Sequence, residues 1–119
     1  MIEFSSNLGL TEENLRDHYE VFESEGSVNT IAFEDRKDVL EYNIKNFFEE
    51  DSEKVTHIFV GLNDHKSPVE IYSVKDPGAI IEKVRSVLKT VSCKFEAYWS
   101  KITCNSKDMV LLKLVKCAS

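Results

Sequence analysis

Apolar and polar residues alternate most clearly near the middle of the chain, over residues 55–74. Two runs rich in β-branched and aromatic residues flank a polar loop at 63–68. Such runs suit the pleated surface of a sheet, and the Asn, Asp and Pro of the loop favour turns. The pattern therefore predicts a central β-hairpin in which Leu62 pairs with Val69.

Side chains alternate along a strand, so this pairing divides the predicted hairpin into two different faces. One face would be aliphatic and would carry Ile58, Val60, Leu62, Val69 and Ile71. The other would be mixed and would carry His57, Phe59, Gly61, Glu70, Tyr72 and Val74. The sequence leaves open whether the mixed face is covered or exposed.

Apolar residues spaced three to four apart predict three helices, over 11–23, 35–50 and 77–91. The third has the strongest start signal, because Asp76 can cap the first turn and Pro77 suits the first helical position. Its buried stripe should comprise Ile80, Ile81, Val84, Val87, Leu88 and Val91.

The remaining apolar runs predict strands. A short strand is expected near residue 2 and another over 27–34, and a second hairpin should join 95–103 to 109–117. With Cys104 opposite Met109, Trp99 would face Leu114 and Tyr98 would face Val115.

The element order is (β)αβα-ββ-α-ββ, which predicts an α+β fold with a mainly antiparallel sheet and helices on one face. It can also be divided into two α-β-β units, 35–74 and 77–117. The helix at 11–23 should cover an edge or end of the sheet.

Length and composition favour one globular domain over residues 1–119, with 42% hydrophobic and 30% charged residues. No apolar run approaches the ~20 residues of a membrane span, and the N-terminus lacks the pattern of a secretory signal. Three cysteines without close spacing suggest reduced thiols. We therefore expect a cytoplasmic protein, or one of the host cytoplasm if the source is viral.

Charge is distributed unevenly along the chain. Residues 1–54 contain 15 Asp and Glu against 5 Lys and Arg, whereas residues 55–119 contain 6 against 10, so a net −10 and a net +4 give the overall −6. Acidic helices beside a mildly basic sheet would explain this asymmetry. An acidic face for a partner with a basic surface would explain it too. That partner-binding face would comprise Glu12, Glu13, Asp17, Glu20, Glu23, Glu49, Glu50 and Asp51.

The mixed face of the central hairpin supplies an alternative, a ligand pocket between sheet and helices. His57 could act there as a tuned acid or base with Glu70 as its partner, or it could simply pack against aromatic rings. Loops often carry binding residues. The candidate ligand-binding set is His57, Phe59, Glu70, Tyr72, Asp64 and His65.

Other chemistries find little support in the sequence. Structural zinc sites need close pairs of Cys and His, and nucleophilic catalysis needs a base beside Ser or Cys, so no metal, cofactor or catalytic residue is assigned. No phosphate-cradling glycine loop is present. A net charge of −6 opposes direct nucleic-acid binding.

The sequence therefore favours a small cytoplasmic binding protein, acting as a regulator, inhibitor or adaptor through macromolecular contacts. A small-molecule-binding domain is the alternative, and a small enzyme of unknown reaction comes third.

Overall fold

Strand β3 (Val55–Val60) is the fourth strand of a five-stranded mixed sheet, in the order β1-β6-β7-β3-β2, with β7 in the middle. The computed structural model describes residues 2–3, 20, 22–50, 54–63, 70–104 and 106–117, with the backbone alone at 2, 3, 70 and 104. Antiparallel pairing joins β3 to β7 and β7 to β6. The two outer pairings, β2 with β3 and β1 with β6, are parallel.

The elements follow the predicted order. The strands of the main sheet are β1 (Ile2–Glu3), β2 (Ser27–Ile31), β3, β6 (Phe95–Cys104) and β7 (Lys107–Lys116). The helices are α2 (Lys37–Glu49) and α3 (Pro77–Leu88), and a separate small sheet pairs β4 (Leu62–Asn63) with β5 (Glu70–Ile71). The predicted α+β class is confirmed, and the longest pairing, β6 with β7, is antiparallel.

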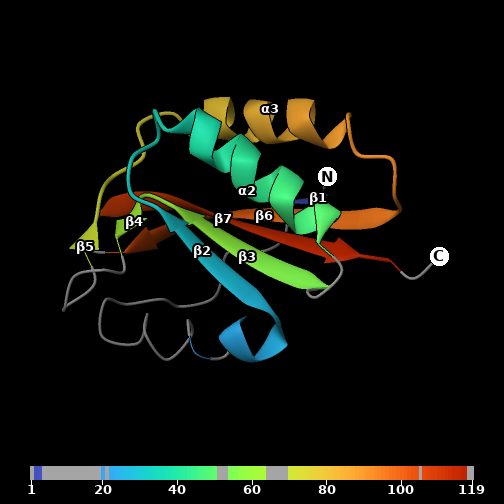
Figure 1. Cartoon of the computed structure of the whole chain (residues 1–119). Helices are drawn as coiled ribbons and strands as arrows, with labels where there is room; N and C mark the ends of the chain where they lie inside the picture. The colour runs from blue at the N-terminus through green and yellow to red at the C-terminus, as the bar shows by residue number, and fades with distance from the viewer. Residues whose placement is uncertain are drawn as a thin grey trace.

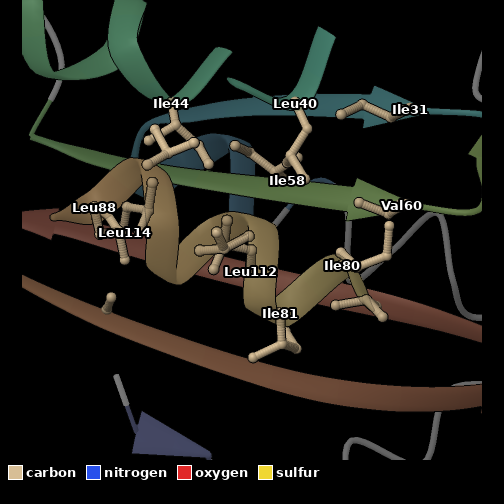
Figure 2. Packing of buried hydrophobic residues seen from close by; sticks show 14 of the residues in the cluster. Ile31, Leu40, Ile44, Ile58, Val60, Ile80, Ile81, Leu88, Leu112 and Leu114 are labelled. Carbon is tan, nitrogen blue, oxygen red and sulfur yellow. The ribbon is translucent and has the colours of Figure 1, made fainter. Parts of the chain in front are cut away.

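Both helices cover one face of the sheet (Figure 1). The core between the layers is aliphatic, and Figure 2 shows side chains from both helices meeting those of β2, β3 and β7. The predicted stripe on α3 is confirmed from Ile80 to Leu88, where the helix ends, and Val91 is partly buried beyond that end. Asp76 caps this helix as expected, because its carboxylate accepts a hydrogen bond of 3.1 Å from the backbone N–H of Ala79. Burial of this stripe holds the helical layer on the sheet.

The opposite face of the sheet carries a second, smaller apolar cluster. Its buried members are Phe59, Leu62, Ile71, Ile102, Met109 and Leu111. A helical turn at residues 22–25 lies against this face, and Phe22 packs on the cluster. This turn is the described end of the helix predicted at 11–23. It therefore contacts a face of the sheet, where an edge or an end was expected.

The central hairpin predicted over 55–74 forms only as a short antiparallel pair, β4 with β5, and its long first strand pairs elsewhere. Strand β3 pairs with β2 and β7, and the strand that follows it in sequence pairs only within the small sheet. Leu62 lies opposite Ile71, where Val69 was predicted. The cause is Gly61, whose φ of +100° turns the chain out of β3. A side chain there would also collide with the chain, because a Cβ would lie 2.7 Å from the carbonyl oxygen of Tyr72.

The second hairpin exists, but its register differs from the predicted one by two residues. Trp99 lies opposite Leu112 and Tyr98 opposite Lys113. The turn is tighter than the predicted four residues, because Cys104 pairs with Lys107 and Ser106 adopts a φ of +63°. A shift of two leaves every side chain on its predicted face.

Two further predictions differ from the structure. Helix α2 begins after Arg36, which makes no side-chain cap hydrogen bond, and it runs over Lys37–Glu49, where 35–50 was predicted. The α-β-β unit is not repeated, because α3 precedes a true hairpin and α2 precedes a strand that pairs elsewhere. Among the described residues, no helix is long and apolar enough to cross a membrane.

Candidate functional site

A pocket of about 400 Å³ opens on the sheet face that α2 and α3 leave uncovered. We call it the His57 pocket. The described residues that line it are Phe22, His57, Glu96, Tyr98, Leu111, Lys113 and Val115. The volume falls in the ~300–1,000 Å³ range of small-molecule sites.

Strand register brings three polar side chains into one row across this face. Tyr98 of β6 pairs with Lys113 of β7, and Lys113 pairs in turn with His57 of β3. Directly paired residues point to the same side of a sheet. The row therefore comes from three strands, so a rigid scaffold holds it.

The ring of His57 is almost sealed from solvent, with 1% of the residue exposed. Phe22 stacks on it, with ring centroids 4.2 Å apart. The Nε2 atom of His57 lies 3.8 Å from Oε2 of Glu25, and the same oxygen lies 3.6 Å from Nζ of Lys113. One carboxylate thus sits beside both the imidazole and the ammonium group.

Gly26 allows the helical turn to approach the sheet so closely. Its N–H donates a hydrogen bond to the carbonyl oxygen of Phe22, which ends the turn. A Cβ at this position would lie 2.0 Å from the carbonyl oxygen of Val55, far inside van der Waals contact. Only glycine places Phe22 and Glu25 over His57 in this way.

Burial lowers the pKa of His57 from 6.5 to about 4. The Glu25 carboxylate opposes this shift and Lys113 adds to it, but the loss of hydration is the largest cause. The imidazole is therefore neutral at pH 7. Its Nδ1 atom is buried and has no hydrogen-bond partner within the described part of the chain.

Tyr98 and Glu96 form the rim of the pocket. The hydroxyl of Tyr98 donates a hydrogen bond of 2.7 Å to Oε2 of Glu96. This bond raises the pKa of Tyr98, because it stabilises the protonated phenol, and the negative charge of Glu96 adds to the shift. The hydroxyl therefore stays protonated, and its proton is directed at Glu96.

The structure separates the residues predicted for a ligand site. His57 lines the pocket, but Phe59 is fully buried in the neighbouring cluster. The carboxylate beside His57 belongs to Glu25, whereas Glu70 pairs with Asn63 in the small sheet. Asp64 and His65 lie outside the described residues.

Tyr72 lies in a different hollow, of about 500 Å³, which Lys75 and Lys107 also line. Its ring centroid is 4.9 Å from that of Phe33, which is 54% exposed. The carboxylate of Glu34 fixes the edge of this hollow by accepting hydrogen bonds from the backbone N–H groups of the Lys75–Asp76 segment. His57 and Tyr72 therefore belong to different surfaces, which corrects the predicted mixed face.

The predicted partner-binding carboxylates are only partly described. Glu20, Glu23, Glu49 and Glu50 are exposed, whereas Glu12, Glu13, Asp17 and Asp51 lie outside the described residues. Lysines of β7 approach this end of the molecule, since Lys116 donates to the carbonyl oxygen of Glu50 and Lys113 pairs with Glu25. Part of the charge asymmetry between the halves is therefore balanced within the fold.

Sequence reasoning missed Phe22, Glu25, Glu96, Tyr98 and Lys113 as members of one site. The correct hairpin register would have placed Tyr98 opposite Lys113. The pairing of β3 with β7 has no comparable local signal, because the two strands are distant in sequence and no turn connects them.

Comparison with protein-family models, with curated proteins and with solved structures finds no match to this chain. Among the described residues, no group of three or more His, Cys, Asp or Glu could hold a metal ion.

Proposed function

We propose that the protein binds a small molecule in the His57 pocket. The observation that carries this proposal is the pocket of about 400 Å³ itself, in which the row of Tyr98, Lys113 and His57 stands beside apolar side chains on the sheet face that α2 and α3 leave uncovered.

The walls of the pocket support the same proposal. Phe22, Leu111 and Val115 supply apolar surface, and Lys113, Tyr98 and Glu96 supply a polar rim. Pockets for small molecules combine an apolar lining with a few placed polar groups in this manner. The alternative function expected from the sequence therefore receives more support than the first, although His57 is the one predicted residue that the described lining retains.

A fragment screen by ligand-observed NMR tests this proposal, with a variant that fills the pocket. Val115→Trp should abolish binding, because Val115 lines the pocket and is only partly buried. Tyr42→Trp is the matched control, since Tyr42 is exposed on α2, over the other face of the sheet. Melting temperatures check that both variants fold. The proposal fails if no fragment binds, or if Val115→Trp binds fragments as the parent does.

A second candidate is the binding of a basic macromolecular partner, in the role of a regulator, inhibitor or adaptor. The exposed residues Glu20, Glu23 and Glu49 favour it. The helical turn at 22–25 leads into β2, and α2 leads toward β3. The three glutamates belong to these segments or lie beside them, and so they are near one end of the sheet (Figure 1). Charge complementarity of this kind speeds association and selects partners.

Charge reversal tests this second candidate. The triple variant Glu20→Lys, Glu23→Lys, Glu49→Lys should have the melting temperature of the parent. It should fail to capture a specific protein that the parent captures from its native cells. Glu82→Lys on α3 is the control, because Glu82 is exposed on a different element. Capture of the same protein by the triple variant would refute the acidic face.

A further inference from the structure

A second hollow, of about 500 Å³, is lined by Phe33, Tyr72, Lys75 and Lys107 among others, and we call it the Tyr72 hollow. Its described lining shares no residue with that of the His57 pocket. Phe33 is 54% exposed in this hollow, even though its ring centroid lies 4.9 Å from that of Tyr72. An aromatic ring that a neighbour holds in place, yet that remains exposed, is available for contact with a ligand.

Backbone hydrogen bonds fix the aromatic wall of the Tyr72 hollow. The N–H of Gly61 donates to the carbonyl oxygen of Ile31, and the carbonyl oxygen of Gly61 accepts from the N–H of Tyr72, each at 2.7 Å. The end of β2, two residues before Phe33, is thereby held against the segment that carries Tyr72. Binding at a preformed surface avoids the free-energy cost of ordering that surface.

Another backbone hydrogen bond brings two lysines to the same hollow. The N–H of Val74 donates to the carbonyl oxygen of Asp108 at 2.8 Å. Lys75 follows the donor residue and Lys107 precedes the acceptor residue, so the two lysines line the hollow from distant segments. Both are exposed, and neither ammonium group has an ion-pair partner in the part of the chain that the structure describes.

Two acidic residues, Glu34 and Asp35, also line the Tyr72 hollow. Both carboxylate oxygens of Glu34 accept backbone N–H groups, from Lys75 at 2.8 Å and from Asp76 at 3.1 Å. These bonds already stabilise the charge of Glu34, so the two ammonium groups stand against the exposed carboxylate of Asp35. One negative charge on a ligand would therefore complete the pairing of charges in the hollow.

We propose that the Tyr72 hollow binds a small planar aromatic anion. The ring of this ligand packs against Phe33 and Tyr72, and its negative charge lies beside Lys75 and Lys107. The volume of the hollow falls in the ~300–1,000 Å³ range of small-molecule sites. Aryl carboxylates and aryl phosphates belong to this class, whereas aromatic amines and aliphatic anions do not. The proposal concerns a second binding site and does not depend on a ligand in the His57 pocket.

A set of compounds of similar shape tests the class on the parent protein. The set is naphthalene-2-carboxylate, 2-naphthyl phosphate, naphthalene-2-carboxamide, 2-naphthylmethylamine and decahydronaphthalene-2-carboxylate. The carboxylate and the phosphate are aromatic anions, the amide removes the charge, the amine reverses it, and the saturated carboxylate keeps the charge but loses the aromatic ring. Titrations followed by NMR of the backbone amides give each affinity and locate the bound compound.

The two aromatic anions should bind and should shift the amide resonances of residues 32–35 and 71–75. The neutral amide should bind about threefold to tenfold more weakly, because exposed ion pairs contribute modestly, and the amine should bind more weakly than the amide. The saturated carboxylate should also bind about threefold to tenfold more weakly, because it loses the contact between aromatic rings. The tighter of the two aromatic anions identifies the anionic group as carboxylate or phosphate.

Variants test the two kinds of contact separately. Phe33→Ser should weaken the binding of naphthalene-2-carboxylate about threefold to tenfold. The double variant Lys75→Gln, Lys107→Gln should lower the affinity for this carboxylate to that for the amide, and it should leave the affinity for the amide unchanged. The double variant Lys89→Gln, Lys94→Gln is the matched control and should bind as the parent does, since both lysines are exposed and lie outside the lining of the hollow. All of these positions are exposed, and melting temperatures check that the variants fold.

Several results would overturn the proposal. They are the absence of shifts at residues 32–35 and 71–75 with either aromatic anion, binding of the amide, the amine or the saturated carboxylate as tight as that of naphthalene-2-carboxylate, and unchanged affinity in Phe33→Ser or in the variant of Lys75 and Lys107. The compounds decide the matter on the parent protein even if a variant does not fold.

The variant Val115→Trp separates this site from the His57 pocket. It should leave the affinity for naphthalene-2-carboxylate unchanged, because Val115 does not line the Tyr72 hollow. Loss of this affinity in Val115→Trp would place the compound in the His57 pocket and overturn the second site alone. Equal fragment binding by Val115→Trp and the parent would instead refute the proposed function alone.

Discussion

The ring of Phe22 lies over the ring of His57, with centroids 4.2 Å apart and planes inclined by 21°. The two residues come from different parts of the fold, a helical turn and strand β3, which lies between β7 and β2 in the sheet. Phe22 is also 5.9 Å from the ring of Phe59, so it joins the buried histidine to the second apolar cluster. This contact shields the imidazole from water on one side.

Replacing Phe22 with alanine should rehydrate His57. The pKa of His57 should rise from about 4 toward 6.5, because loss of hydration is the main cause of its shift. Stability should fall by about 1–3 kcal/mol through the lost ring packing. An NMR titration of the His57 ring measures the first effect and urea unfolding the second. Phe22→Leu should show smaller changes in both, and a pKa that remains at about 4 in the alanine variant would contradict the shielding role.

The stability of the protein should depend on pH through His57. Its pKa is about 4 in the folded chain and 6.5 in the unfolded chain, so the unfolded state binds the extra proton between these values. The free energy of unfolding is highest, as far as His57 is concerned, above pH 6.5. It decreases as the pH falls below that value, and the contribution of His57 is lost near pH 4. The loss amounts to about 2–3 kcal/mol. The groups that face the ring are the Glu25 carboxylate and the Lys113 ammonium.

The variant His57→Phe isolates this effect from the titration of other groups. It cannot be protonated, so its stability relative to the parent should improve by about 2–3 kcal/mol between pH 7 and pH 4. Urea unfolding at a series of pH values provides the comparison. Parallel stability curves for the two proteins would show that His57 is not the titrating group.

Gly61 and Gly78 provide a matched pair for backbone effects. Gly61→Ala should destabilise the protein by about 2–4 kcal/mol, because φ is +100° and the new Cβ would meet the carbonyl oxygen of Tyr72 at 2.7 Å. Gly78→Ala should be neutral or stabilise by up to ~1 kcal/mol, since it lies in α3 and its nearest neighbour is at 3.4 Å. Chemical denaturation measures the free energy of unfolding of both variants. Equal changes in that free energy for Gly61→Ala and Gly78→Ala would contradict this account.

The cap of α3 should contribute measurably to stability. Asp76→Ala removes the hydrogen bond to the N–H of Ala79 and should cost about 1 kcal/mol. Asp76→Ser should retain most of that free energy, because a serine hydroxyl can accept the same bond. Thermal unfolding measures the stability of both variants. Identical losses of stability would mean that the capping hydrogen bond does not cause the loss in Asp76→Ala.

Features set by local chemistry could be predicted from the sequence. The start of α3 depends on Asp76 and Pro77, and its buried face follows from helical spacing, so both were predicted correctly. The hairpin of β6 and β7 was found because its strands are adjacent in sequence. Its register was wrong because the turn at Ser106 is tighter than the four polar residues suggest.

Features set by distant pairing could not be predicted. The partners of β3 are a parallel strand before it and an antiparallel strand well after it, and no turn specifies either. The alternation in 55–74 was real, but Gly61 breaks it between β3 and β4, so the supposed mixed face does not exist as one surface. His57 was predicted as a site residue with Glu70 as its partner, whereas its actual neighbours Phe22, Glu25 and Lys113 depended on the tertiary fold.

The position of β7 also has a consequence for how the chain folds. This strand begins at Lys107 and lies between β6 and β3, so the sheet is continuous only once it has inserted. Until then β3, which ends at Val60, lacks its antiparallel neighbour and β6 lacks its hairpin partner. Contacts between segments so far apart in sequence slow folding toward the millisecond-to-second range. Synthesis on the ribosome therefore leaves β3 paired on one side only, with β2, until β7 has emerged.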